Sequence, residues 1–355
     1  MSVFVIAEAG VNHNGEAGKA FALIDAAVAA GADAVKFQTF RAKEVISANA
    51  PKAPYQTKTT DPAETQLEMV KKLELSEALH NELAKHCAKK EIRFLSTPFD
   101  GPSLRFLVND MKLNTLKIPS GEITNGPLLL QAGESGCDII LSTGMSDMIE
   151  VEVALGVLAF GLAKTGSEPS AQAFKESFAS AAGQAALKEK VTVLHCTTEY
   201  PAPFEDTNLK AMATLKDAFG LRVGLSDHTP GIAVAIAAAA LGAGVIEKHF
   251  TLGRSLPGPD HQASLEPGEL AEMVTGIRAV EQALGDGNKK LQPSEIKNKD
   301  IARKSLVALK PIKAGEAFTI ENLGIKRPGT GVSPMEYWER IGKKADHDVT
   351  EDEQL

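Results

Sequence analysis

VIEKHF, residues 245–250, starts as a buried strand and ends in three ionisable side chains. A surface strand alternates polar and apolar residues, and a core strand stays apolar until it turns. This run does neither, because two apolar residues are followed at once by Glu247, Lys248 and His249. It predicts a strand that leaves a packed interior and carries its last residues to a functional surface.

The same pattern of an apolar run followed by polar residues recurs along the chain. Seven other runs have it: VFVIAE, ADAVKFQ, IRFLSTP, TLKIPSGE, CDIILSTG, VTVLHCT and LRVGLSDH. Helical stretches lie between the runs, and eight such units over ~250 residues predict a closed (β/α)₈ barrel of the TIM type. A doubly wound open sheet is the alternative, but GVNHNG, after the first run, lacks the GxGxxG spacing typical of that fold.

Outside this pattern, the sequence indicates an insertion, a linker and a second domain. A catalytic barrel is expected over residues 1–285, with a partly helical insertion at about 164–188 that is small and polar and lies at the periphery. Residues 286–300 are charged with almost no apolar content, which predicts a linker. Residues 301–355 contain short β segments punctuated by Pro and Gly, and they are too few for a large core.

Composition excludes several classes of protein. The 355 residues are 43% hydrophobic and carry a formal net charge of -8, which argues against a nucleic-acid or acidic-membrane surface. The start, MSVFVIAEAG, lacks a basic n-region, and no apolar run approaches the ~20 residues of a membrane span. Cys87, Cys137 and Cys196 are scattered without a CxxC, so we expect reduced thiols in a cytoplasmic protein.

The carboxyl ends of the predicted strands carry polar side chains at nearly every position. In a barrel these ends converge on one face, where the chemistry is collected. The residues there are Glu8, Lys36, Gln38, Ser96, Thr97, Lys117, Ser120, Glu122, Ser142, Thr143, His195, Thr198, Ser226, Asp227, His228, Glu247, Lys248 and His249. Each one alone has an ordinary explanation, such as a helix cap or a solvated lysine, but their coincidence at all eight ends favours an active site.

Two histidines indicate a metal site. His228 and His249 end adjacent strands, and two imidazoles on neighbouring strands can share one divalent ion that keeps open positions for water and substrate. A hydrogen-bonded pair of core histidines is the alternative. Glu8 lies on the strand next to that of His249 around the closure, which favours the metal, with Mn²⁺ or Mg²⁺ suiting the site better than zinc.

Two lysines indicate an anion site. Lys36 and Lys117 stand at interior strand ends, where burying them without an anion would be costly. The hydroxyls of Ser96, Thr97, Ser120, Ser142 and Ser226 surround them in the predicted barrel. This set of groups suits a phosphate, or a phosphate with a carboxylate.

Nine motifs together resemble the sialic acid synthase family. They are AEAGVNHNG, KFQTF, FLSTPFD, KIPSGEITN, ILSTGMS, LHCTTEYPAPFEDTNL, GLSDHTPG, EKHFTL and GPDHQASLEP, in order over almost the whole chain. The tail, ARKSLVALKPIKAGE followed by KRPGTGVSP, resembles the C-terminal antifreeze-like (SAF) domain of that family. One departure concerns Thr198, where some members have Asn. APKAPYQTKTT and LEMVKKLEL resemble the bacterial branch that makes N-acetylneuraminate or N,N'-diacetyllegionaminate.

The resemblance implies a transferase that condenses phosphoenolpyruvate with N-acetylmannosamine or 2,4-diacetamido-2,4,6-trideoxymannose, plus water, to give a nine-carbon 2-keto acid and phosphate. It implies a domain-swapped homodimer and a divalent metal, with Mn²⁺ preferred and Mg²⁺ or Co²⁺ as alternatives, on His228 and His249. The phosphoenolpyruvate-binding residues would be Lys36, Gln38, Thr97, Lys117, Ser120, Ser142 and Ser226. The sugar-binding residues would be Glu122, Tyr200, Asp260 and Arg327, the last from the SAF domain of the other subunit.

The catalytic residues implied are Glu8, Asp260, Glu122 and Arg327. Glu8 suits the general base for water, or a group that stabilises a cationic centre, and Asp260 suits proton transfer at the sugar oxygen. Which carboxylate serves which step stays open. Because neighbours on a strand alternate, Lys248 is expected on the side opposite His249.

Several alternatives stay open. A 9-phosphate-forming synthase would use N-acetylmannosamine 6-phosphate and keep the SAF tail. A divalent-metal barrel hydrolase would need more ligands, usually an HxH pair after the first strand, where GVNHNG offers one His. Seven- or eight-carbon keto-acid synthases would need an extra basic cluster and lack the tail, and a glycan- or ice-binding role would leave the strand ends unexplained.

Overall fold

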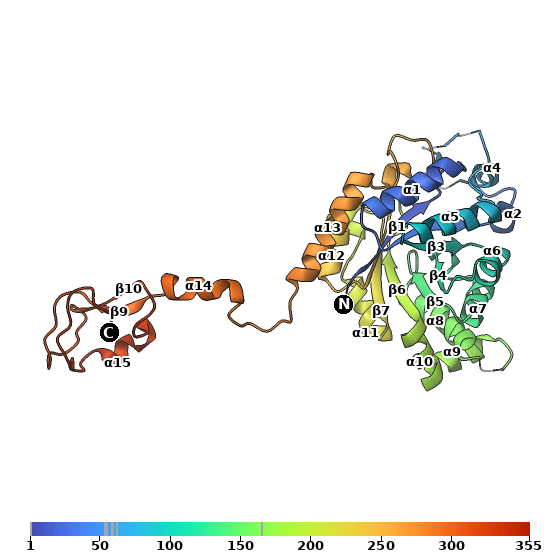
Figure 1. The fold of residues 1–355 in the computed structure, drawn as a ribbon. Coiled ribbons are helices and arrows are strands. Elements are labelled where there is room, and N and C mark those ends of the chain that lie inside the picture. Colours follow the sequence, from blue (N-terminus) through green and yellow to red (C-terminus); the bar gives the residue numbers. More distant parts are fainter. Residues whose placement is uncertain (1, 53–55, 58–59, 62, 165) are drawn as a thin grey trace. The chain divides into compact units, whose positions relative to one another are not determined.

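Eight parallel strands form one sheet in the order β3-β2-β1-β8-β7-β6-β5-β4, and β3 and β4, at the two ends of that order, contact each other (Figure 1). The strands are β1 Phe4–Gly10, β2 Ala34–Thr39, β3 Arg93–Pro98, β4 Thr115–Ile118, β5 Asp138–Ser142, β6 Val191–Cys196, β7 Arg222–Asp227 and β8 Val245–His249. The structure, a computed structural model, describes residues 2–52, 56–57, 60–61, 63–164 and 166–355. The predicted (β/α)₈ barrel is confirmed, and it belongs to the first of two units, Met1–Gly285 and Asp286–Leu355.

Helices surround the barrel on the outside (Figure 1). They are α1 Ala17–Ala29, α2 Ala42–Val45, α4 Gln66–Lys71, α5 Glu77–Lys89, α6 Gly101–Arg105, α7 Gly126–Glu134, α8 Met148–Ala163, α9 Ala171–Ala179, α10 Ala181–Lys190, α11 Ala211–Phe219, α12 Ala233–Ala240 and α13 Pro267–Ala283. Short 3₁₀ turns include Ser120–Glu122 and His261–Ala263. No helix among the described residues has the length and apolar character needed to cross a bilayer.

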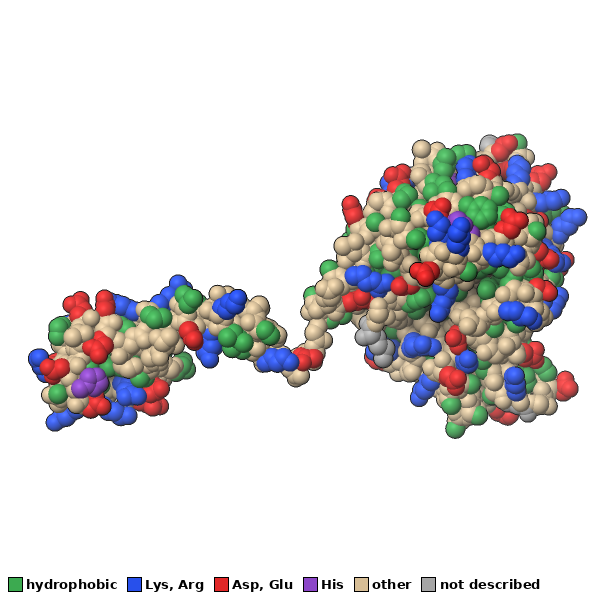
Figure 2. All heavy atoms as spheres, viewed as in Figure 1, with side chains coloured by type: hydrophobic (Ala, Val, Ile, Leu, Met, Phe, Trp, Pro, Cys, Tyr) green, Lys and Arg blue, Asp and Glu red, His purple; other side chains and the backbone are tan. Residues whose placement is uncertain are grey.

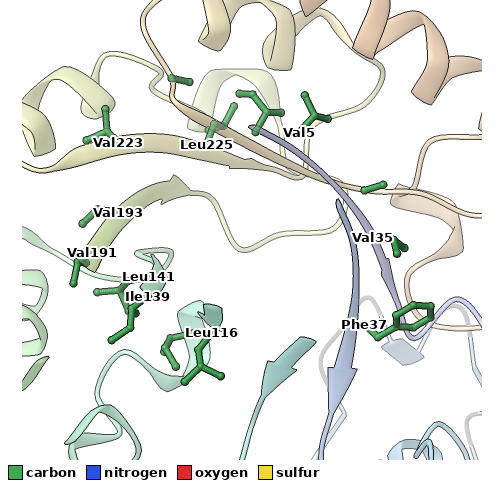
Figure 3. Close-up of a cluster of buried hydrophobic side chains, with 14 of the residues drawn as sticks. Val5, Val35, Phe37, Leu116, Ile139, Leu141, Val191, Val193, Val223 and Leu225 are labelled. Atoms are coloured by element: carbon green, nitrogen blue, oxygen red, sulfur yellow. The ribbon is translucent and has the colours of Figure 1, made fainter. Parts of the chain in front are cut away.

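Alternate residues of each strand face the helices and build the main core. Figure 3 shows Val5, Val35, Phe37, Leu116, Ile139, Leu141, Val191, Val193, Val223 and Leu225 in this position. The period of two is that of a pleated strand. The runs read as strands in the sequence are therefore apolar because one face meets helices and the other meets the barrel interior.

The barrel interior changes from apolar to polar along the strands. The lower layer is a separate apolar cluster made of Ile6, Ala34, Leu95, Ile140, Leu194 and Val245. Two residues further along each of these strands, on the same face, stand Glu8, Lys36, Thr97, Ser142, Cys196 and Glu247. The apolar layer closes the barrel from below, so the polar layer forms the floor of a site at the carboxyl ends.

A close approach of β7 and β8 explains one glycine. A Cβ on Gly224 would lie 2.2 Å from the carbonyl oxygen of Val245. Any side chain at this position would push the two strands apart. Gly224 therefore allows the close spacing of β7 and β8, the strands that place His228 and His249.

The insertion forms two helices on the barrel's periphery. Helices α9 and α10 pack on α8, and none of their residues lines the pocket described below. In the described part of residues 164–188, where the sequence predicted a partly helical insertion, the structure has α9 and the greater part of α10.

The second unit contains a helix where the sequence predicted only a linker. Helix α14, Pro293–Ala302, is exposed along its length. Its start is fixed by a capping box between Gln292 and Glu295 and by Pro293 at the first turn. The sequence did not predict this helix, because low apolar content argues against a core and says nothing against a capped helix.

The rest of the second unit is a small β module. Strands β9 Ser305–Ala308 and β10 Leu323–Lys326 pair antiparallel. Its core consists of Leu306, Ala308, Ile312, Phe318, Leu323, Ala345 and Val349. On the face of each unit shown in Figure 2, acidic and basic side chains are interspersed.

Candidate active site

A cavity of about 300 Å³ opens at the carboxyl ends of the barrel strands. Most of the residues predicted for the site line it: Glu8, Lys36, Gln38, Thr97, Lys117, Ser120, Ser142, Tyr200, Ser226, His228, His249 and Asp260. They come from strands, and from loops and turns after strands, that are far apart in sequence, and the barrel brings them together.

Some predicted residues of the barrel do not line the cavity, among them Ser96, whose hydroxyl lies 2.6 Å from that of Thr39, and Glu122. Glu122 is half-buried in the turn after Ser120, and its carboxylate accepts a hydrogen bond from Asn125 Nδ2 at 2.6 Å. Arg327 belongs to the second unit, where it is exposed and its Nε donates to the carbonyl of Ala302 at 3.1 Å. The roles assigned to both stay predictions.

Two ammonium groups and two carboxylates meet on the floor of the cavity. Lys36 Nζ lies 2.7 Å from Glu8 Oε2 and 3.7 Å from Glu247 Oε2. Lys117 Nζ lies 3.5 Å from Glu247 Oε1. The Ser226 hydroxyl donates to Glu247 Oε1 at 3.0 Å. Glu247 is thus shared by both lysines, and all four charged side chains are buried.

Burial makes the two carboxylates differ in proton affinity. Burial raises the pKa of Glu8 from 4.5 to about 7, even with Lys36 beside it. Burial would also raise the pKa of Glu247, but Lys117 and Lys36 outweigh it and lower that pKa. Two carboxylates near one cation cannot ionise with equal ease, so Glu247 stays charged and Glu8 is able to exchange a proton near neutrality.

The two lysines of the floor also differ in the direction in which their pKa is shifted. Burial tends to lower the pKa of Lys36, but Glu247 and Glu8 raise it above its usual value. Burial lowers the pKa of Lys117, which faces one carboxylate at a longer distance. An anionic ligand near Lys117 would favour its charged form, so the floor is suited to accept additional negative charge.

The imidazoles of His228 and His249 lie side by side with ring centroids 5.4 Å apart. His228 Nδ1 donates to the carbonyl of Thr197 at 2.7 Å, which leaves Nε2 with its lone pair. His249 Nδ1 is buried and has no hydrogen-bond partner among the described residues. Burial, together with nearby positive groups, holds the pKa of His249 well below its usual value. A divalent metal binds the neutral form of both rings. Burial tends to lower the pKa of His228, but Cys196 raises it above its usual value, so a metal would compete with a proton at that ring.

Asp260 completes this side of the cavity. Its Oδ2 lies 3.9 Å from His249 Nδ1, and burial raises its pKa to about 6. Among the described residues, no group of three or more His, Cys, Asp or Glu side chains is arranged to hold a metal ion. The residues that fit a dication are therefore the two imidazoles, with the remaining coordination positions open to other ligands.

Sequence reasoning missed some residues of the site. Glu247 was predicted at a strand end but was given no role in binding, and it proves to be the carboxylate between both lysines. Cys196 lines the cavity with Sγ 3.8 Å from His228 Nδ1. Burial would raise the pKa of Cys196, but His228 outweighs it and lowers it to about 7. Strand alternation was the available signal for both, since each follows two residues after an inward-facing apolar residue.

An apolar cluster that the sequence did not indicate also lines the cavity. It consists of Val11, Phe40, Val45, Val70, Leu73 and Phe99. The rings of Phe40 and Phe99 meet edge to face with centroids 6.1 Å apart. These residues come from loops and short helices, so no periodic pattern marks them, but together they offer the cavity an apolar surface next to the charged floor.

The fold and the cavity together define a (β/α)₈-barrel enzyme with a small C-terminal β domain. The NeuB family matches residues 23–289, and the SAF domain matches residues 303–355. The chain therefore belongs to the NeuB family, as the motifs predicted.

Individual relatives cover nearly the whole chain. N,N'-diacetyllegionaminic acid synthase of Campylobacter jejuni is 53% identical over 98% of this chain and 97% of that protein. The N,N'-diacetyllegionaminic acid synthase of Legionella pneumophila is 43% identical over 97% of this chain and 90% of that protein. The crystal structure of N-acetylneuraminic acid (sialic acid) synthetase from Leptospira borgpetersenii, in complex with citrate, superposes with a TM-score of 0.68 at 34% identity. It covers 84% of this chain and 90% of that one.

Proposed function

We propose that this protein is a nonulosonic acid synthase, a transferase that forms a carbon–carbon bond between phosphoenolpyruvate and an N-acetylmannosamine-type aldose. The products are a nine-carbon 2-keto acid and phosphate. The observation that carries the proposal is the floor of the cavity, where Lys36 and Lys117 stand beside two carboxylates and two imidazoles. The synthases of C. jejuni and L. pneumophila support it.

Phosphoenolpyruvate is the ligand that suits the two lysines. Its phosphate and carboxylate supply the negative charges that Lys36 and Lys117 stabilise in a buried setting. The hydroxyls of Ser120, Ser142 and Ser226 also line this cavity. Because C3 of the enol is a weak nucleophile, holding it in place against the aldehyde is a large part of catalysis.

The proposed reaction forms one carbon–carbon bond and breaks one carbon–oxygen bond. C3 of the enol attacks the aldehyde carbon, and positive charge develops at C2. Water adds to C2 and loses one proton. The tetrahedral centre then expels phosphate as the bond from C2 to the phosphate oxygen breaks, and the remaining hydroxyl proton passes to the departing phosphate as the 2-keto group forms. We assign the proton of that water to Glu8, whose pKa lies near 7, and the proton of the sugar oxygen to Asp260.

His228 and His249 are the residues we propose to hold a divalent metal, with Mn²⁺ preferred over Mg²⁺ and Co²⁺. Such an ion, when bound, supplies Lewis acidity for the aldehyde oxygen. The unpartnered Nδ1 of His249 and the lone pair of His228 Nε2 support this assignment. Glu8, across the strand pairing from His249, is close enough in the fold to serve the same substrates.

The proposed role of Glu8 predicts an acid limb in the pH profile. Because burial raises the pKa of Glu8 to about 7, its carboxylate becomes protonated as the pH falls through that value and can no longer accept a proton. We expect kcat/KM to fall about tenfold per pH unit below about pH 7. Steady-state phosphate release measured from about pH 5 to 9, with metal in excess, checks this. A flat profile over the same range would show that Glu8 is not the base.

We further propose that the enzyme prefers 2,4-diacetamido-2,4,6-trideoxymannose to N-acetylmannosamine as its aldose. The first sugar carries three methyl groups and the second carries one. The apolar cluster of Val11, Phe40, Val45, Val70, Leu73 and Phe99 offers a surface for them. Two more buried methyl groups, at roughly 0.8 kcal/mol each, correspond to a preference on the order of 10-fold in kcat/KM.

A phosphate-release assay tests the proposed function. Phosphoenolpyruvate and Mn²⁺ are supplied with each of three aldoses: the diacetamido sugar, N-acetylmannosamine and N-acetylmannosamine 6-phosphate. We expect release with the first two and a preference for the first. Release with the 6-phosphate alone would establish the 9-phosphate-forming alternative, and no release with any of them would overturn the proposal.

The proposal includes a homodimer in which the SAF domain of one subunit completes the site of the other, with Arg327 contacting the sugar. Arg327→Ala is then expected to raise KM for the aldose about tenfold or more, while phosphoenolpyruvate binding changes little. Aldose KM and phosphoenolpyruvate Kd, from steady-state kinetics and calorimetry, check this. Arg340→Ala, on the same domain and paired with Glu336, is the matched control. An unchanged aldose KM in the Arg327 variant would rule out the contact.

A further inference from the structure

A buried charged pair links the ends of β7 and β8 directly behind the two imidazoles. The strand register pairs Ser226 with Glu247 and Asp227 with Lys248. His228 directly follows Asp227 in the chain, and His249 directly follows Lys248. Ser226, Glu247 and both histidines line the cavity, whereas Lys248 does not. Lys248 thus lies on the opposite strand face, as strand alternation predicted.

The ammonium of Lys248 donates hydrogen bonds to both chain neighbours of His228. Lys248 Nζ donates to Asp227 Oδ2 at 2.8 Å and to the carbonyl oxygen of Thr229 at 2.7 Å. Asp227 Oδ1 in turn accepts from the backbone N–H and the hydroxyl of Thr229, at 2.9 and 2.8 Å. Residues 227–229 are therefore tied into one loop around His228, and the side chain that ties them belongs to the residue immediately before His249.

This arrangement is poorly explained by stability alone. Lys248, Asp227 and Thr229 are each at most 2% exposed. Removing two charges from water offsets most of their attraction, so an apolar pair of similar volume would hold the strands at least as well. An apolar pair would not fix the direction of the backbone. The four hydrogen bonds among Lys248, Asp227 and Thr229 do so on either side of His228, because each has a preferred geometry.

We propose that Lys248, with Asp227 and Thr229, positions the two imidazoles relative to each other so that a divalent cation meets a preorganised pair of nitrogens. This inference rests on the metal site of the proposed function. His228 is fixed further by its bond to Thr197, whereas His249 Nδ1 has no partner among the described residues. The placement of His249 therefore depends on the backbone, which the Lys248 link sets. Lys248 is a positioning residue, since its side chain does not reach the cavity.

Two variants test the proposal. Lys248→Met removes the link and leaves Asp227 buried without its cation. Asp227→Leu combined with Lys248→Met replaces the pair by apolar side chains of similar size, which restores the packing without the hydrogen bonds. Mn²⁺ affinity of the enzyme without substrates is measured by electron paramagnetic resonance of free Mn²⁺, alongside Tm, kcat and KM.

We expect Lys248→Met to lower both Tm and Mn²⁺ affinity. In the double variant, Tm is expected to return toward that of the wild type, while Mn²⁺ affinity stays about 10- to 100-fold weaker. In the double variant we expect kcat to fall together with Mn²⁺ affinity, while KM for phosphoenolpyruvate stays within about threefold of the wild-type value. A double variant that recovers wild-type Mn²⁺ affinity together with Tm would overturn the proposal.

Milder and distant variants keep the test decisive. Thr229→Val deletes only the hydroxyl bond to Asp227 and is expected to weaken Mn²⁺ binding about threefold; unchanged affinity and an unchanged spectrum of bound Mn²⁺ would count against the proposal. Arg278→Met removes an ion pair with Asp33 at the amino-terminal end of the barrel and is expected to lower Tm alone. If the wild type binds no Mn²⁺, the proposed metal site fails; if the wild type binds and the variants bind equally, only this inference fails.

Discussion

Lys36→Met is expected to lower kcat/KM for phosphoenolpyruvate by about 1,000-fold or more. Lys36 is buried, and its ammonium contacts Glu8 and Thr97 at 2.7 Å each. Without this cation, a bound phosphoenolpyruvate would face Glu8 and Glu247 with only Lys117 to balance their charge. Loss of one charge-stabilising donor in a water-poor site costs about 10²- to 10³-fold, and the repulsion between ligand and carboxylates adds to it.

Steady-state kinetics and calorimetric binding of phosphoenolpyruvate measure this effect. Lys90→Met is the control, because Lys90 pairs with Asp25 on the outer surface at 2.8 Å and is partly exposed; kinetics within about twofold of wild type are expected. Near-ultraviolet circular dichroism establishes that the Lys36 variant is folded. A folded Lys36 variant with wild-type affinity for phosphoenolpyruvate would refute the anion site.

His249→Ala is expected to lose Mn²⁺ binding and, with it, Mn²⁺-dependent turnover by about 1,000-fold or more. With two protein ligands proposed, deletion of one leaves a single imidazole, which is too weak to retain a divalent ion at micromolar concentration. Lewis-acid assistance contributes several kcal/mol to the transition state, which corresponds to roughly 10³-fold or more in rate. The fold should survive, since the variant shortens a side chain that lines a cavity.

Free Mn²⁺ in equilibrium with the enzyme, followed by electron paramagnetic resonance, reports the loss directly. His195→Ala is the matched control, because His195 also ends a barrel strand but its Nε2 bonds the carbonyl of Thr207 at 2.6 Å and it does not line the cavity. This control should retain Mn²⁺ affinity. Unchanged Mn²⁺ affinity in His249→Ala would place the metal elsewhere.

Most of the barrel and the identity of its polar floor could be predicted from the sequence. VIEKHF contains the reason: residues two apart on a strand share a face, so Glu247 and His249 had to stand together, with Lys248 opposite. Parallel strands also had to end on one face of the barrel. Such rules are local and periodic, so they can be read without knowing which strands are neighbours in space.

Distances between strands could not be predicted in this way. That Glu247 lies between Lys36 and Lys117, and that burial separates the pKa of Glu8 from that of Glu247, depends on contacts across the barrel. Glu122 shows the same limit, because its motif put it in the site while the turn holding it turns its carboxylate toward Asn125.

The sequence by itself thus determined the succession of strands along the chain, the face on which each strand side chain stands and most members of the polar floor. Pleating and helix periodicity are properties of a few consecutive residues, so a sequence shows them directly. Only the tertiary structure decided which charged side chains share partners and that Lys248 links the neighbours of His228. It also decided that loops and short helices after different strands form an apolar surface beside the floor. The physical reason is that electrostatic and packing energies depend on separations of a few ångströms between residues distant in the chain, which closure of the barrel alone sets.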